Sequence, residues 1–284
     1  MIPTSKLLKQ DVRTRFAELV RQPDNQINLA LAALLIAAEE EPGVDVESYL
    51  ARLDEMGAEA CRRIKQHIDD PVAQLNEYLF QDLNFTGNLG NYYDPRNSLL
   101  NHVLDQRTGI PITLSLVYIE VGRRAGLRVE GVGMPGHFIV RVFTEQLFAE
   151  GTLVDPFEGR TITEDDCQER LDTFYSGQVP LRAEHLRTFT TKDFLARMLR
   201  NLQAIYAQAK LHRQTLAVVE RLLLLAPEAI EERRNRGTLL AHLNRYAEAV
   251  TELQAYLQLA PNAADTDAVR EQLSRLQGRL AAQN

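Results

Sequence analysis

A histidine and an aspartate stand at the ends of two apolar stretches in the middle of the chain. His137 opens an alternating apolar stretch at 137–143, and Asp155 closes a second one at 147–155. An imidazole that hydrogen-bonds a carboxylate is held in one tautomer and can serve as a general base. We therefore expect a hydrogen bond between these two side chains. Such a pair can also persist purely as structure, or bind a polar ligand.

The two cysteines lack the surroundings of a nucleophile. Cys61 lies on the apolar face of a predicted helix, which favours a buried structural thiol. Cys167 follows three acidic residues, 164–166, and neighbouring carboxylates raise the pKa of a thiol. Neither cysteine is therefore expected to supply a reactive thiolate.

The sequence predicts no metal site and no cofactor. His137 and Asp155 are possible ligands, but no third ligand has suggestive spacing. The other histidines are scattered and are expected on solvated surfaces or helix faces: His67, His102, His185, His212 and His242.

Composition restricts the class of protein and its partners. The 284 residues fit one large domain or two ordinary ones, with ample apolar material for a core. A formal net charge of -7 argues against a nucleic-acid partner, whose phosphates are bound mainly by Lys and Arg. The most apolar segment, 28–38, is too short to span a bilayer, so no membrane partner is expected. Two cysteines indicate a reducing compartment, and by elimination we expect a cytoplasmic protein.

The hydrophobic pattern changes character along the chain. Helical periodicity predicts helices throughout residues 1–83. A loop rich in Asn and Gly follows at 84–95, then helices at about 97–104 and 112–124. Alternating or β-branched residues then predict strands at 127–132, 137–143, 147–155 and 160–162. Helices and strands within one unit predict an α+β fold.

The C-terminal part is helical and repeats itself. Leu225-Ala226-Pro227 recurs as Leu259-Ala260-Pro261, an offset of 34 residues, which is the length of a tetratricopeptide repeat. An unrelated helical bundle with coincidental spacing is the alternative. We predict about two tetratricopeptide-like repeats.

Four motifs together resemble a known group. They are Asn91-Tyr92-Tyr93-Asp94-Pro95, Asn97-Ser98-Leu99-Leu100-Asn101, Gly109-Ile110-Pro111-Ile112-Thr113-Leu114 and Pro135-Gly136-His137-Phe138. In these motifs the chain resembles the bacterial transglutaminase-like plus tetratricopeptide-repeat proteins, known as invasion regulators of the Sir-B-one type. The resemblance implies a papain-like, transglutaminase-like domain at 1–190, with a helical part at 1–83 and a core at 84–190. Tetratricopeptide-like repeats would follow at 191–284.

The resemblance also assigns a catalytic frame that lacks its nucleophile. In the active pattern a Cys opens a helix about fifteen residues before a turn such as that at Gly126, and counting back places Pro111 there. His137 and Asp155 match the general base and its orienting carboxylate. Proline suits a helix start but has no side-chain nucleophile, so these two positions are vestigial. Thr113 or Ser115 is the alternative nucleophile.

A polar cluster beside this frame is the candidate binding cleft. Asparagine and aspartate often simply cap helices and stabilise turns. The functional interpretation is that the cluster and His137 line one cleft, formed by Tyr92, Asp94, Asn97, Asn101, Arg107 and Pro111. The favoured function is a non-catalytic scaffold or regulator that binds a protein or peptide through this cleft and the repeat groove. The alternative is an unconventional hydrolase or acyl transferase that uses Thr113 or Ser115 with His137 and Asp155.

Overall fold

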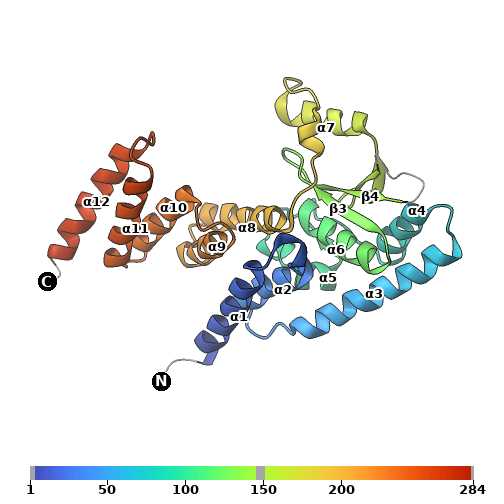
Figure 1. The fold of residues 1–284 in the computed structure, drawn as a ribbon, viewed down its shortest axis with the longest axis horizontal. Coiled ribbons are helices and arrows are strands. Elements are labelled where there is room, and N and C mark those ends of the chain that lie inside the picture. The colour runs from blue at the N-terminus through green and yellow to red at the C-terminus, as the bar shows by residue number, and fades with distance from the viewer. Residues whose placement is uncertain (1–3, 145–150, 283–284) are drawn as a thin grey trace. The chain divides into compact units, whose positions relative to one another are not determined.

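The computed structural model describes residues 4–144 and 151–282, and the chain divides into two compact units, 1–198 and 199–284 (Figure 1). The first unit combines helices with a four-stranded sheet, and the second is entirely helical in the part described. This arrangement confirms the predicted α+β fold followed by an all-α segment.

The N-terminal part of the first unit is helical, as predicted. Its helices are α1 (Thr4–Val20), α2 (Leu29–Glu40), α3 (Val46–Gln66) and α4 (Pro71–Asn76), followed by a π-helical turn, η2 (Glu77–Asp82). Side chains before three of them accept backbone N–H bonds, which satisfies the free donors of a first turn: Asn28 from Leu31, Asp45 from Ser48 and Asp70 from Ala73. Nearly every residue of α2 is buried, so this helix is central to the unit. Within the described ranges, no helix has the length and apolar character needed to cross a membrane.

The loop after α4 leads into the central helix of the core. Two short parallel strands, β1 (Thr86–Gly87) and β2 (Thr108–Gly109), bracket a 3-10 turn, η3 (Pro95–Ser98), and helix α5 (Leu100–Gln106). Helix α6 (Pro111–Arg124) begins directly after β2 with a proline at its first position, where a missing N–H costs little. Residues 111–122 of α6 are all buried, and this helix packs against α3, β3 and β4.

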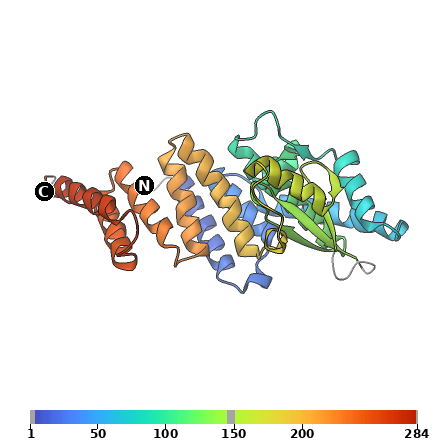
Figure 2. The same cartoon turned by 90° about the horizontal axis from the view of Figure 1, so that it is seen from above.

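An antiparallel sheet with helices on both faces completes the first unit. Its strands pair in sequence order: β3 (Arg128–Val132), β4 (Ile139–Phe143), β5 (Thr152–Asp155) and β6 (Arg160–Ile162). Successive side chains point to opposite faces of a strand. One face, with Ile139 and Leu153, packs against Cys167 and Leu171 of α7 (Glu164–Tyr175), which crosses the sheet in Figure 2. The other face carries Val129, which packs against α6.

Two details differ from the sequence prediction, and a predicted strand is described only in part. His137 does not open a strand, because β4 begins at Ile139. Residues 134–137 instead form a turn in which His137 N–H donates to Met134 O (3.2 Å). Of the strand predicted at 147–155, residues 147–150 lie outside the described residues and 152–155 form β5. Helix α7 was not predicted, although Thr163 and Asp166 form a capping box at its start.

The second unit consists of paired helices around one apolar core. A 3-10 turn, η4 (Ala183–Leu186), precedes α8 (Thr191–Gln208), which extends from the first unit into the second. The remaining helices are α9 (His212–Leu225), α10 (Ile230–His242), α11 (Tyr246–Leu259) and α12 (Thr266–Ala281). Their shared core includes Leu216, Leu240, Leu253, Tyr256 and Val269.

The 34-residue period is present in the backbone as well as in the sequence. Lys210 and Asn244 both adopt positive φ, at 56° and 60°, just before α9 and α11. At the other ends of these two helices, Ala226 N donates to Leu222 O (2.9 Å) and Ala260 N donates to Tyr256 O (2.8 Å). Each pair of equivalent residues is 34 positions apart, so the repeat interpretation holds and the coincidental bundle does not.

One long-range cap joins the N-terminal region to the start of α8. The carboxylate of Asp24 accepts hydrogen bonds from Thr191 N (2.9 Å) and Lys192 N (2.8 Å). Thr190 Oγ1 accepts a third, from Asp193 N (3.1 Å). These acceptors satisfy three of the four N–H groups that a helix start leaves without partners.

Asp24→Ala should therefore lower the unfolding free energy by about 1 kcal/mol, the usual cost of losing a helix cap. The measurement is urea denaturation of the full chain followed by circular dichroism. Asp69→Ala is the matched control, because Asp69 is exposed and makes no described hydrogen bond or ion pair. Equal destabilisation by the two variants would show that the cap contributes nothing of its own.

Candidate functional site

His137 is presented by a tight turn ahead of β4. Gly136 adopts positive φ (72°), and a Cβ there would come within 2.6 Å of the Phe174 ring, so only glycine fits. The imidazole Nε2 lies 2.9 Å from Asp155 Oδ2, which is the expected His–Asp hydrogen bond. Because a carboxylate accepts, Nε2 carries the proton and the other ring nitrogen, Nδ1, is left for other partners.

The Asp155 carboxylate is fully buried and hydrogen-bonded at both oxygens. Oδ1 accepts from the backbone N–H groups of Phe157 (2.9 Å) and Glu158 (3.2 Å). Oδ2 accepts from His137 and also from the Arg170 guanidinium. Burial works to raise the pKa of Asp155, but the hydrogen bond and charge of His137, the charge of Arg170 and the Glu158 N–H outweigh it and lower that pKa. Asp155 is therefore an anion at neutral pH.

Arg170 is the residue of this cluster that the sequence analysis missed. It lies on α7, contacts Asp155 and pairs with Glu158 Oε1 at 2.5 Å. Its Nε is buried without a hydrogen-bond acceptor among the described residues. The pattern of charges could have indicated its role. Arg160 and Arg170 are the only cationic residues in the acidic segment 158–172, so each is expected to pair with a carboxylate. Since Arg170 shares Oδ2 with His137, a permanent cation offsets the charge of Asp155.

The first turn of α6 carries the position assigned to the nucleophile. Pro111 is its first residue and is buried. The Thr113 hydroxyl donates to Asn97 O (2.7 Å) and accepts from Ile110 N (3.1 Å). The Ser115 hydroxyl is 3.5 Å from Phe138 O, beside His137 in the chain. Both hydroxyls are thus fully buried and directed at main-chain carbonyls.

The polar loop before α6 is organised around Asn97. Its Nδ2 donates to Asn91 O (2.7 Å) and Tyr92 O (3.2 Å), and its Oδ1 accepts from Asn88 (3.0 Å). Asp94 accepts from Arg96 N (2.9 Å), and the ion pair with Arg96 lowers the pKa of Asp94. These contacts are turn and cap interactions of the kind that asparagine and aspartate commonly make.

The structure distributes the predicted cleft residues over several places. Asp94 and Asn97 line a pocket of about 320 Å³ that does not include His137. Asn101 donates to Glu41 at the end of α2 (3.1 Å), and Arg107 ends α5 in the left-handed region. A single cleft shared with His137 remains a prediction.

Tyr92 approaches His137 through a series of aromatic contacts. The rings of Tyr93 and Tyr92 have centroids 5.3 Å apart, those of Tyr92 and Phe157 are 6.3 Å apart, and those of Phe157 and His137 are 6.1 Å apart. All three pairs are edge-to-face, a favourable geometry for aromatic rings. Phe157 was not singled out in the sequence, and it fits because Gly87 leaves room for its ring.

Both cysteines are free, and Cys167 is buried. Burial, with carboxylates including Asp166 and Glu164 adding to it, raises the pKa of Cys167 to about 11 despite the opposing charge of Arg170. Cys61 is partly exposed rather than buried as expected.

Comparison with known proteins identifies both parts of the chain. Residues 47–200 match the transglutaminase-like superfamily, and residues 202–274 match a tetratricopeptide repeat family. A UPF0162 protein of Xylella fastidiosa (strain 9a5c) is 36% identical, covering 88% of this chain and 90% of its own length. A UPF0162 protein of Pseudomonas aeruginosa is 30% identical over 75% of this chain and 77% of its own length. The protein SirB1 of Salmonella typhimurium is 25% identical over 81% of this chain and 85% of its own length. These matches confirm the resemblance found in the sequence.

Asp155→Asn should lower the unfolding free energy near neutral pH by roughly 2 kcal/mol, the scale of a hydrogen bond to a charged group. Because the pKa of Asp155 is lower in the folded state, its contribution is present above the ordinary carboxyl value of about 4 and is lost as pH falls through the folded value. The difference between wild type and variant should therefore shrink as pH falls below about 4.

Chemical denaturation at a series of pH values measures this difference. Asp165→Asn is the control, because Asp165 is exposed on α7 and makes no described side-chain contact. A wild-type advantage over Asp155→Asn that is independent of pH would contradict the role given to the charge.

Proposed function

This chain belongs to the transglutaminase-like superfamily, and on that premise we propose that it is a protein- or peptide-binding scaffold or regulator without transglutaminase or protease activity. The observation that carries the proposal is the first turn of α6, where a buried proline stands at the position assigned to the nucleophile. A triad of this kind needs a thiolate, which its histidine and the positive end of the helix stabilise. Proline offers no such group.

The nearby hydroxyls are poor substitutes. The Thr113 hydroxyl makes hydrogen bonds to the backbone of residues 97 and 110, and so links the polar loop to α6. Ser115 is fully buried and its hydroxyl faces a carbonyl oxygen, which cannot take its proton as a general base would. The alternative of a hydrolase or acyl transferase using either hydroxyl with His137 and Asp155 is therefore the weaker one.

The contact of Arg170 with Asp155 also supports the proposal of catalytic inactivity. In a working centre, an aspartate carboxylate orients the histidine and stabilises its protonated form during the reaction. Here Asp155 also contacts a permanent cation. Its negative charge is already offset, so less of it remains to stabilise a protonated His137.

The tetratricopeptide repeats support the part of the proposal that concerns binding. Tetratricopeptide repeats stack into extended concave surfaces, which commonly bind other proteins. We propose that residues 1–190 act as the transglutaminase-like part and 191–284 as the repeat part, because α8 begins at Thr191. Two free cysteines fit a reducing compartment, so we propose that the protein acts in the cytoplasm.

Catalytic inactivity is tested by covalent labelling. A fluorophosphonate probe incubated with the full chain should leave Thr113 and Ser115 unmodified, as read by mass spectrometry of proteolytic peptides. Ser115→Ala and His137→Ala are the matched variants. Labelling of either hydroxyl in wild type that disappears in His137→Ala would establish an activated nucleophile and refute the proposal.

Binding is tested by selection from a displayed library of random peptides on the immobilised full chain. We expect one sequence pattern to be enriched over selection on an unrelated helical protein. A selected peptide should then bind the chain in solution, as measured by fluorescence anisotropy. If no pattern is enriched in repeated selections, the scaffold role loses its basis.

A further inference from the structure

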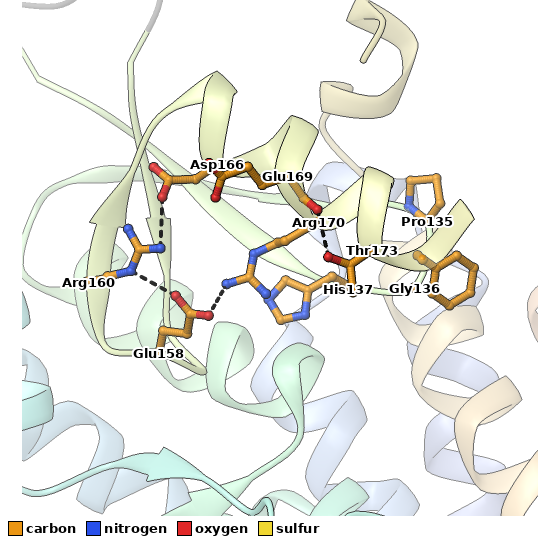
Figure 3. Close-up of a pocket in the computed structure, with 10 residues that line it drawn as sticks. Pro135, Gly136, His137, Glu158, Arg160, Asp166, Glu169, Arg170 and Thr173 are labelled. Atoms are coloured by element: carbon orange, nitrogen blue, oxygen red, sulfur yellow. Dashed lines mark hydrogen bonds and ion pairs between the residues drawn. The ribbon is translucent and has the colours of Figure 1, made fainter. Parts of the chain in front are cut away.

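A pocket of about 550 Å³ lies between His137 and the exposed face of α7. Its walls include Gly136 and His137 from the turn before β4, and Glu158 and Arg160 from the segment after β5. Residues 166, 169, 170, 173 and 174 come from α7 and recur at helical spacing, so they share one face of that helix. Figure 3 shows Glu158 between Arg160 and Arg170, with an ion pair to each.

The two arginines of the pocket are already paired. Arg160 contacts Glu158 (2.8 Å) and Asp166 (2.9 Å). Arg170 contacts Glu158 (2.5 Å) and the buried Asp155 behind the pocket wall. Three carboxylates line the pocket, those of Glu158, Asp166 and Glu169, against two guanidinium groups. The pocket therefore has an excess of negative charge.

Glu169 holds the carboxylate that remains without a partner. It is exposed on α7 and lines the pocket, and among the described residues no cation lies within ion-pair distance of it. Its backbone carbonyl accepts a hydrogen bond from Thr173 (2.9 Å), which leaves the side chain uninvolved. A cationic ligand would neutralise this carboxylate, which has no cationic partner among the described residues.

Phe174 adds an aromatic surface at the rim. It is 60% exposed, so its ring is accessible to a ligand. It is held by contact with Gly136 and by an edge-to-face contact with Tyr175 (4.9 Å). A pocket lined by both an exposed aromatic ring and an unpaired carboxylate is a favourable place for a cation with an apolar stem.

We propose that this pocket binds the cationic side chain of an arginine or lysine on a partner protein. The charged group would pair with Glu169, and its alkyl stem would pack on Phe174. This inference rests on the proposed function, since it names the chemistry of the partner. It is independent of the repeat groove, because all of the residues involved belong to the first unit.

The test compares probes that differ in charge alone. The peptide acetyl-Gly-Gly-Arg-Gly-Gly-amide is titrated into the isotopically labelled full chain, and binding is read from the imidazole signals of His137 by NMR. The same peptide with citrulline in place of arginine keeps the shape without the charge. We expect citrulline to weaken binding by about fivefold, because it loses both the ion pair and the cation–π contact. Raising ionic strength should weaken the arginine peptide selectively.

Three variants locate the interaction. Glu169→Gln and Phe174→Leu should each weaken the arginine peptide by about threefold. Asp165→Asn removes one charge from the same helix outside the pocket and should leave binding unchanged. Circular dichroism verifies that each variant is folded, as expected for substitutions at exposed positions.

The outcomes separate this inference from the proposed function. Equal binding of the arginine and citrulline peptides, or equal effects of Glu169→Gln and Asp165→Asn, would overturn the cation pocket. So would tighter binding of free methylguanidinium than of the arginine peptide, because the occupant would then be a small cation. None of these results bears on catalytic inactivity, which is decided by labelling at Thr113 and Ser115.

Discussion

The buried carboxylate of Asp155 is the interaction on which the arrangement of the site depends. An ionised group without solvent is tolerated only when its oxygens are fully hydrogen-bonded. Here the donors come from three places: the turn before β4, the backbone after β5 and a side chain of α7. One residue thus fixes the orientation of His137, the course of the chain around Phe157 and the position of α7 at this end of the sheet.

We propose that the same set of contacts distinguishes this site from a working triad. A catalytic carboxylate holds its histidine and leaves charge available for the reaction, whereas Asp155 is shared with Arg170. The geometry of a His–Asp pair is present, and under this proposal the contact with Arg170 leaves less of the Asp155 charge to act on His137. The pair also has a structural role, since loss of the His137 or Arg170 donor would leave part of the buried anion unsatisfied.

Local signals predicted much of the fold but little of the site. The apolar run of α2 and the 34-residue period can both be recognised along the chain itself, and each matches the structure. Helix α7 was missed because its sequence is strongly charged and its buried side chains are few, so its apolar periodicity is weak. Arg170 was missed together with α7. Its contact with Asp155 joins a helix to a strand residue fifteen positions away in the chain. Side chains from separate elements meet only through tertiary packing, which spacing along one element does not encode.

The cap that Asp24 provides to α8 bears on where this domain can be cut. The region matched to the superfamily, residues 47–200, omits both Asp24 and the wholly interior helix α2. A fragment limited to that region would expose the apolar surface that α2 covers and leave the first N–H groups of α8 to solvent. The segment recognised by sequence is thus smaller than the packed unit, which also contains α2 and the capping residue Asp24.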